Sequence, residues 1–325
     1  MSALLDRRLL FVTGKGGTGK TTAAAALADL AVRAGRRVLV VEMDAKGAIA
    51  AAFEVDALGF EPVEASPGLW LMAMNTEDSL REYLRVVARV PLVGRIGPLA
   101  RTFDFVADAA PGVKEILAIG KVCWEVRERH YDLVIVDAEA SGHIVAQIDA
   151  PRAIRELVQV GPVREQIEWM LKILDDPAST GVVVVTTPEE MPVTETVELV
   201  DRIRVRTNVD VAAVVVNRML SPWFEATDES TFDALCEADT AAVLASAVGE
   251  KSGAKVRTVL EAAALAQRRA DVAAEHLERL RAGLPAAVPM LTVPELFTKA
   301  SGRRVVTLMA DRLAAYGDAL VGERR

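Results

Sequence analysis

Nine residues near the N-terminus carry a phosphate-binding pattern. The stretch Gly14-Lys15-Gly16-Gly17-Thr18-Gly19-Lys20-Thr21-Thr22 fits G-x-x-x-x-G-K-[ST] at every position, between an apolar run and an alanine-rich run. Glycines let backbone N–H groups converge on a polyphosphate, and a following helix directs its positive end toward it. Lys20 is placed to reach the β- and γ-phosphates, and Thr21 to hold Mg²⁺. The alternative, a glycine-rich turn with a solvated lysine, is disfavoured by the strand before the loop and the helix after it.

The second lysine of this loop is the more specific feature. Lys15 lies inside the loop rather than at its end. A lysine at that position resembles the deviant Walker A loop of the MinD, ParA and nitrogenase iron protein class. The resemblance implies that Lys15 acts catalytically on the nucleotide of a partner subunit.

Two carboxylates follow apolar strands. Asp137 ends the run Leu133-Val134-Ile135-Val136, where a Walker B carboxylate would hold Mg²⁺ through water. Asp44 ends a second run, and it could orient the attacking water or complete the Mg²⁺ shell, since strand ends at one sheet edge converge on the ligand crevice. Both have a structural alternative as helix caps or turn residues. Glu42 is close enough to Asp44 to compete for the catalytic role.

Asn217 and Arg218 close a further β-branched run. A side-chain amide there can both donate to and accept from a base edge, which suits adenine. Asn also favours turns, and the residues alone leave these two interpretations open.

Strand-like and helical segments alternate along the chain. Helical patterns cover 189–205, 231–282 and 303–321, and apolar or β-branched runs predict strands at 9–13, 38–41, 69–74, 133–137, 182–185, 211–216 and 288–291. This order predicts an α/β fold of the phosphate-loop NTPase type, with a mostly parallel central sheet covered by helices on both faces. We expect one domain over 1–325, with a helical insertion at 76–129 and a helical hairpin at 228–284.

Composition narrows the class further. The chain has 325 residues, a net charge of −8, 5% aromatic residues and two distant cysteines, Cys123 and Cys236. The acidic balance argues against a nucleic-acid surface, and the cysteines form no CxxC clip. No apolar run approaches the length of a membrane span, and the first residues lack the order of a signal peptide. We therefore expect a cytoplasmic protein.

The motifs together resemble the anion-transporting ATPase family. That family includes the arsenite-pump ATPase and the ATPase that targets tail-anchored membrane proteins. The resemblance is carried by the loop 15–21, Asp44, the stretches 110–115, 137–143 and 187–191 with Glu195, and Asn217-Arg218. It implies ATP and Mg²⁺ as cofactors and a nucleotide-sandwich dimer. Asp44 would be the water-orienting residue of switch I, Asp137 the start of switch II, and Asn217 and Thr292-Val293-Pro294-Glu295 would surround adenine. The insertion would form the client or partner surface.

Departures from the family pattern are informative. Switch I of the family reads Asp-Pro-Ala-His-Asn, whereas this chain has Asp44-Ala45-Lys46-Gly47-Ala48. Switch II reads Asp-Thr-Ala-Pro-Thr-Gly-His, whereas this chain has Asp137-Ala138-Glu139-Ala140-Ser141-Gly142-His143. The zinc-clasping CxxC and the metalloid-binding cysteines of family members are absent, so arsenite transport is disfavoured. Cys123 and Cys236 are better interpreted as buried small apolar residues.

These features favour two functions. The first is an ATP-driven switch, in which nucleotide closes a homodimer or a heterodimer and the insertion controls a protein client. The second is a weakly hydrolysing regulatory or scaffold subunit that pairs with a paralogous ATPase. Membrane partition of the MinD kind is a third hypothesis, with peripheral contact at most, and a kinase or ligase on the same loop stays open. The insertion's arginines, Arg81, Arg85, Arg89, Arg95 and Arg101, form either a basic partner surface or a solvated helix face.

Overall fold

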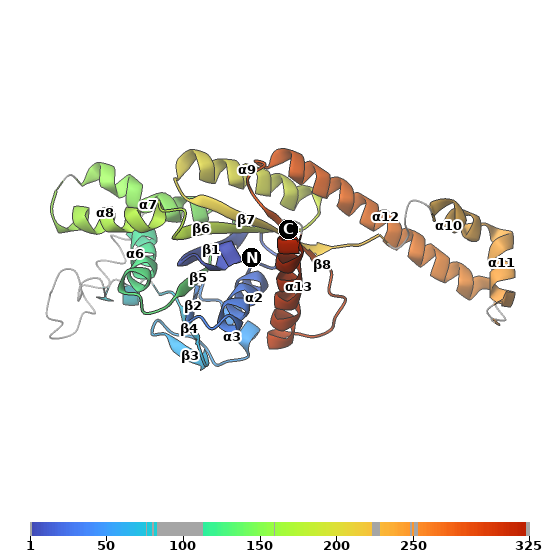
Figure 1. Ribbon diagram of the computed structural model, residues 1–325, viewed down its shortest axis with the longest axis horizontal. Helices are drawn as coiled ribbons and strands as arrows, with labels where there is room; N and C mark the ends of the chain where they lie inside the picture. Colours follow the sequence, from blue (N-terminus) through green and yellow to red (C-terminus); the bar gives the residue numbers. More distant parts are fainter. Residues whose placement is uncertain are drawn as a thin grey trace.

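The computed structural model describes residues 2–75, 77–79, 81–82, 113–158, 160–222, 228–247, 249 and 253–322. Its centre is an eight-stranded sheet in the order β3-β4-β2-β5-β1-β6-β7-β8 (Figure 1). Every neighbouring pair is parallel except β3 with β4. The strands are β1 (Leu9–Gly14), β2 (Val38–Glu42), β3 (Val63–Ser66), β4 (Leu69–Ala73), β5 (Leu133–Asp137), β6 (Thr180–Thr186), β7 (Asp210–Met219) and β8 (Met290–Pro294).

Helices cover both faces of this sheet, as expected for the central strands β1, β2, β5 and β6, whose residues are all buried. One apolar cluster joins the sheet to α1 (Ser2–Leu5), α2 (Lys20–Arg33), α3 (Ala48–Phe53) and α13 (Gly302–Gly322). The other joins it to α6 (Val113–Glu128), α7 (Ile144–Leu157), α8 (Pro162–Leu174), α9 (Glu190–Arg206) and α12 (Gly253–Gly283). The predicted fold class is thereby confirmed: this is an α/β sheet of the phosphate-loop NTPase type.

Most predicted elements are present, with two differences. The last strand runs over Met290–Pro294 rather than 288–291, because Val288 N–H bonds Pro285 O in a turn and the following residues pair with β7. The edge strand β3 and the helices α7 and α8 were not predicted. β3 shows no buried alternation, since its four residues are exposed or half-buried.

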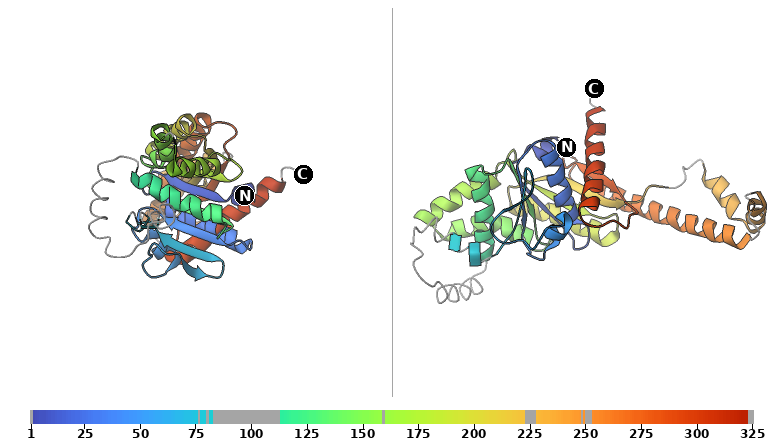
Figure 2. Two further views of the ribbon diagram at one scale, coloured as in Figure 1. Left: turned by 90° about the vertical axis from the view of Figure 1, so that its left-hand side faces the viewer. Right: turned by 90° about the horizontal axis from the view of Figure 1, so that it is seen from below.

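The segment expected to be a helical hairpin holds α10 (Glu229–Cys236), α11 (Ala238–Ala247) and α12. Only the C-terminal part of α12 packs on the sheet body, against α9. Its other end extends away from the body and carries α11 and α10 (Figures 1 and 2). This arm is long because α12 has 31 residues.

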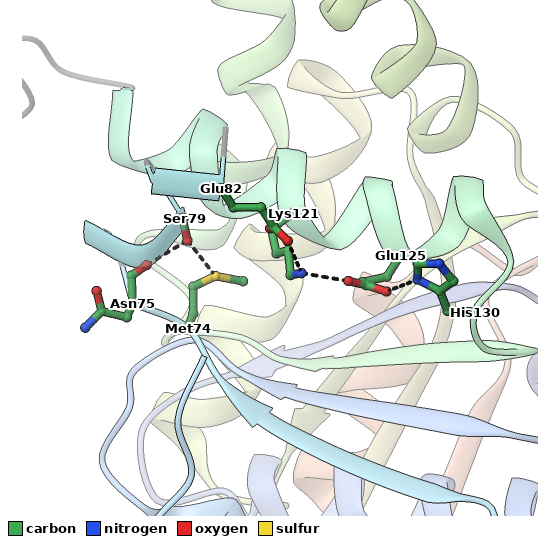
Figure 3. A network of polar contacts seen from close by, with 7 residues as sticks. All are labelled: Met74, Asn75, Ser79, Glu82, Lys121, Glu125 and His130. Atoms are coloured by element: carbon green, nitrogen blue, oxygen red, sulfur yellow. Dashed lines mark hydrogen bonds and ion pairs between the residues drawn. The ribbon is translucent and has the colours of Figure 1, made fainter. Parts of the chain in front are cut away.

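Residues 83–112 of the expected insertion lie outside the described part of the chain, and with them Arg85, Arg89, Arg95, Arg101 and the stretch 110–112. The described end of the segment is α6, which packs beside β5, α7 and α8. A polar network joins the two described ends (Figure 3). The buried Lys121 ammonium on α6 contacts Glu82 at 2.9 Å and Glu125 at 2.7 Å, and Glu125 also contacts His130. Burial alone would lower the Lys121 pKa, but these carboxylates outweigh it and raise that pKa.

Among the described helices, none combines the length and the apolar character that crossing a membrane requires.

Candidate functional site

The phosphate-binding loop connects β1 to α2 at the carboxyl edge of the sheet. β1 lies between β5 and β6, so the loop stands beside the strand that ends in Asp137. The Thr21 hydroxyl donates a hydrogen bond to Asp137 Oδ2 at 2.7 Å. Two of the three residues predicted from the sequence as Mg²⁺ ligands, Thr21 and Asp137, lie 116 positions apart and meet directly; the third, Asp44, stays a prediction.

The donor set suits Mg²⁺, which prefers hard oxygen ligands. Asp137 is 6% exposed, and its Oδ1 has no hydrogen-bond partner within the described residues. Burial raises the Asp137 pKa to about 6, with added repulsion from Glu42 and Asp44, although the Thr21 bond and Lys20 oppose the shift. A buried carboxylate oxygen without a partner is costly unless a cation meets it. Thr21 and Asp137 would hold the ion here.

The two loop lysines point to different places. Lys20 Nζ lies 3.4 Å from the Lys15 carbonyl oxygen, over its own loop. Lys15 instead forms an ion pair with Glu195 on α9. Both side chains of that pair are about one-third exposed. The Lys20 side chain thus lies over its own loop, while the Lys15 side chain is directed away from the loop.

The remaining loop residues shape the cradle. The Thr18 hydroxyl donates to Lys15 O at 2.9 Å, and Gly14 O accepts from Ser141 N–H of switch II. Gly16 and Gly17 have open space where a Cβ would stand. Thr22 lines a cavity of about 400 Å³ with Thr21, α3 and the start of α13.

Asn217 buttresses the loop in this structure. Its Nδ2 donates to Thr18 O at 2.9 Å, and its Oδ1 accepts from Arg218 N–H. Gly19 has φ 95°, and a Cβ on it would lie 2.5 Å from Asn217 Nδ2. Glycine is therefore required at position 19 for the close approach as well as for the backbone. The predicted contact of Asn217 with adenine stays a prediction.

Residues predicted near adenine border a second cavity. A space of about 620 Å³ is lined by Arg218 near the end of β7, Leu220 after it, Glu295 and Phe297 after β8, and Arg268 on α12. Val293 is buried in the core, and Pro294 pairs with Met219 at the strand ends. Any contact of Val293 with a base would therefore involve its backbone.

The segment predicted as switch I, residues 44–48, adopts a conformation that the family's proline would not permit. Ala45 has φ 48°, whereas proline fixes φ near −65°. Gly47, in place of the family's histidine, has φ 76°. In this conformation the Asp44 carboxylate is 42% exposed and forms an ion pair with Lys46 at 2.7 Å. The predicted water-orienting carboxylate is thus engaged by its own neighbour.

Glu42 is the residue whose environment the sequence did not reveal. It lies at the end of β2, is 2% exposed and accepts a hydrogen bond from Ala48 N–H at 2.8 Å. Its Oε2 has no partner among the described residues. Its position two residues before Asp44 was the only signal, and it could not show which carboxylate is buried.

Other predicted residues are placed as follows. In the stretch predicted as switch II, Glu139 O accepts a hydrogen bond from the Thr13 hydroxyl of β1 at 3.0 Å, and the exposed His143 lies 3.9 Å from the Glu139 carboxylate. Cys123 is buried as predicted, and burial raises its pKa. The Cys236 side chain lies outside the described set. The described residues hold no group of three or more His, Cys, Asp or Glu side chains arranged for a metal ion.

Comparison with known proteins shows the family to which this chain belongs. The chain matches the anion-transporting ATPase family over residues 7–160 and 147–240, and it belongs to that family. ATPase BagA of Mycobacterium tuberculosis is 32% identical over 238 residues, which cover 70% of this chain and 69% of that protein. An ATPase ASNA1 homolog of Entamoeba dispar is 26% identical over 250 residues, covering 65% and 76% respectively. ATPase get3 of Neurospora crassa is 27% identical over 172 residues, covering 51% and 50%.

Proposed function

We propose that this protein is a Mg²⁺-dependent ATPase switch, in which nucleotide drives dimer closure and thereby controls a protein client or partner rather than arsenite. Relatives in the family are named ATPases, which supports the hydrolytic activity. The observation that carries the proposal is the divergence of the two lysines of one loop. Lys20 covers its own loop, and Lys15 reaches outward to α9.

The chemistry assigned to each residue follows from its position. Mg²⁺, when bound, neutralises charge on the transferring phosphate. Thr21 and Asp137 hold the ion, and Lys20 supplies a point charge to the β- and γ-phosphates. Asp44 orients the attacking water once it leaves Lys46. Lys15 adds a cation to the partner subunit's nucleotide when two copies meet.

Substituting the two lysines separately tests this division. Lys20→Ala should abolish binding of both ADP and ATP. Lys15→Ala should keep ADP affinity and lose turnover by roughly 10³- to 10⁵-fold, as for other cations supplied across an interface. Calorimetry and phosphate release measure these effects, with the exposed Lys172→Ala on α8 as the matched control. Wild-type affinity in Lys20→Ala would contradict the site, and equal loss of ADP and ATP in Lys15→Ala would contradict action across a dimer.

The Asp44–Lys46 ion pair favours a second candidate, the weakly hydrolysing subunit of a heterodimer with a paralogous ATPase. An Asp44 engaged by Lys46 is withdrawn from orienting water. If this pair limits hydrolysis, Lys46→Ala should increase phosphate release without changing ADP affinity. Because an exposed ion pair contributes little free energy, the increase should stay below roughly fivefold. An unchanged or lower rate in Lys46→Ala would remove the structural support for this candidate.

A further inference from the structure

We propose that Glu42 is an additional carboxylate for the divalent cation, acting beside Thr21 and Asp137 at the end of strands β2 and β5. This inference deepens the proposed function and rests on its nucleotide–Mg²⁺ site. It assigns the buried Glu42, rather than the exposed Asp44, to the metal.

Strand register brings the two carboxylates together. Glu42 and Asp137 are the last residues of neighbouring parallel strands, and they are paired in register. Each side chain uses one oxygen in a protein contact: Asp137 Oδ2 with the Thr21 hydroxyl, and Glu42 Oε1 with Ala48 N–H. The other oxygen of each is buried and has no partner within the described residues.

Two unpaired carboxylate oxygens in one buried place are unfavourable by themselves. Glu42 adds to the repulsion felt by Asp137, and so does Asp44, while Lys20 is the opposing cation. Burying an unpaired charged oxygen is costly, and like charges on adjacent strands destabilise the sheet. A divalent cation with oxygen ligands, direct or through water, would satisfy both free oxygens at once.

Glu42 differs from Asp44 in both burial and partner. Asp44 is 42% exposed and already neutralised by Lys46. Glu42 is 2% exposed, and through Ala48 N–H it holds the first turn of α3, which follows the switch I loop. A cation bound at Glu42 Oε2 would therefore be linked through one side chain to the end of switch I.

Glu42→Gln separates the cation role from the structural role. Glutamine keeps a carbonyl oxygen for Ala48 N–H and removes the charge. Mn²⁺ titration of the ADP complex, followed by electron paramagnetic resonance, should show about 10- to 100-fold weaker metal affinity than in the wild type. ADP affinity measured in EDTA should stay unchanged. The exposed Glu64→Gln on β3 removes the same charge elsewhere and should match the wild type in both measurements.

Thermal unfolding supplies a readout that does not depend on turnover. In EDTA, Glu42→Gln should unfold at the same temperature as the wild type or higher, because one carboxylate of the pair is neutralised. The upward shift on adding Mg²⁺ and ADP should be smaller in the variant. Wild-type Mn²⁺ affinity in Glu42→Gln would overturn the inference, as would loss of metal-free ADP binding, which would make Glu42 a purely structural residue. A wild-type protein that binds no metal–nucleotide complex would instead refute the proposed function.

Discussion

At the scale of single residues, ionisation of the buried Asp137 carboxyl group is unfavourable in the protein without bound metal. Its pKa is raised from 3.8 to about 6 by burial. An acid with a raised pKa holds its proton more tightly when folded, so between pH 4 and pH 6 the folded state binds more protons than the unfolded state. Stability in EDTA should therefore fall as pH rises through this window, by at most about 3 kcal/mol for a shift of that size, and then level off.

Chemical denaturation from pH 4 to pH 7 measures how the free energy of unfolding depends on pH, and Asp137→Asn should weaken that dependence. Mg²⁺ with ADP should flatten it too, because a bound cation favours the ionised carboxylate. A wild-type slope of the opposite sign through the same window would mean that Asp137 is stabilised as a carboxylate by protein groups alone.

At the scale of elements, β7 supports the phosphate loop through one side chain. Asn217 Nδ2 holds Thr18 O, and Gly19 leaves the room for it. If this contact shapes the phosphate-binding loop, Asn217→Ala should lower the affinities for pyrophosphate, ADP and GDP by similar factors. The expected factor is about fivefold, for one hydrogen bond of roughly 1 kcal/mol. Competition binding with the three ligands measures this. Selective loss of ADP with pyrophosphate unaffected would instead support the contact with adenine.

The sequence predicted the helices and strands that have strong periodicity or β-branched runs. The loop, the strand ending in Asp137 and the strand that contains Asn217 were predictable, because strand–loop–helix order and valine-rich runs are local signals. β3 was missed because its pairing with β4 is a tertiary contact without an amphipathic pattern. The Lys15–Glu195 pair and the burial of Glu42 depend on residues far apart in the chain or on neighbouring strands, which spacing does not reveal.

At the scale of the whole molecule, the proposed dimer closure would have to compete with the Lys15–Glu195 pair. To reach a partner subunit's nucleotide, Lys15 must leave Glu195 on its own α9. Both side chains are partly exposed, and such pairs contribute about 0–1 kcal/mol. Coupling between a nucleotide and an association equilibrium is typically about 1–3 kcal/mol. The intramolecular pair would therefore lower the proposed closure equilibrium slightly but is too weak to prevent it.

We accordingly predict a monomer or weak dimer without nucleotide or with ADP, and tighter association with ATP. No CxxC clasp follows Asn217, and Ala48 stands in place of the asparagine of the family's switch I pattern, so the proposed γ-phosphate contact of Lys15 is what would distinguish the closed state. Sedimentation velocity of Asp44→Asn, chosen to slow hydrolysis, should show association constants about 5- to 150-fold higher with ATP than with ADP. The double variant with Lys15→Ala should show no difference between the two nucleotides.

A stable dimer whose association does not depend on nucleotide would contradict the proposed switch. The natural partner would be a paralogue if the Asp44 variant with ATP stays monomeric alone but associates with a second family member from the same cell.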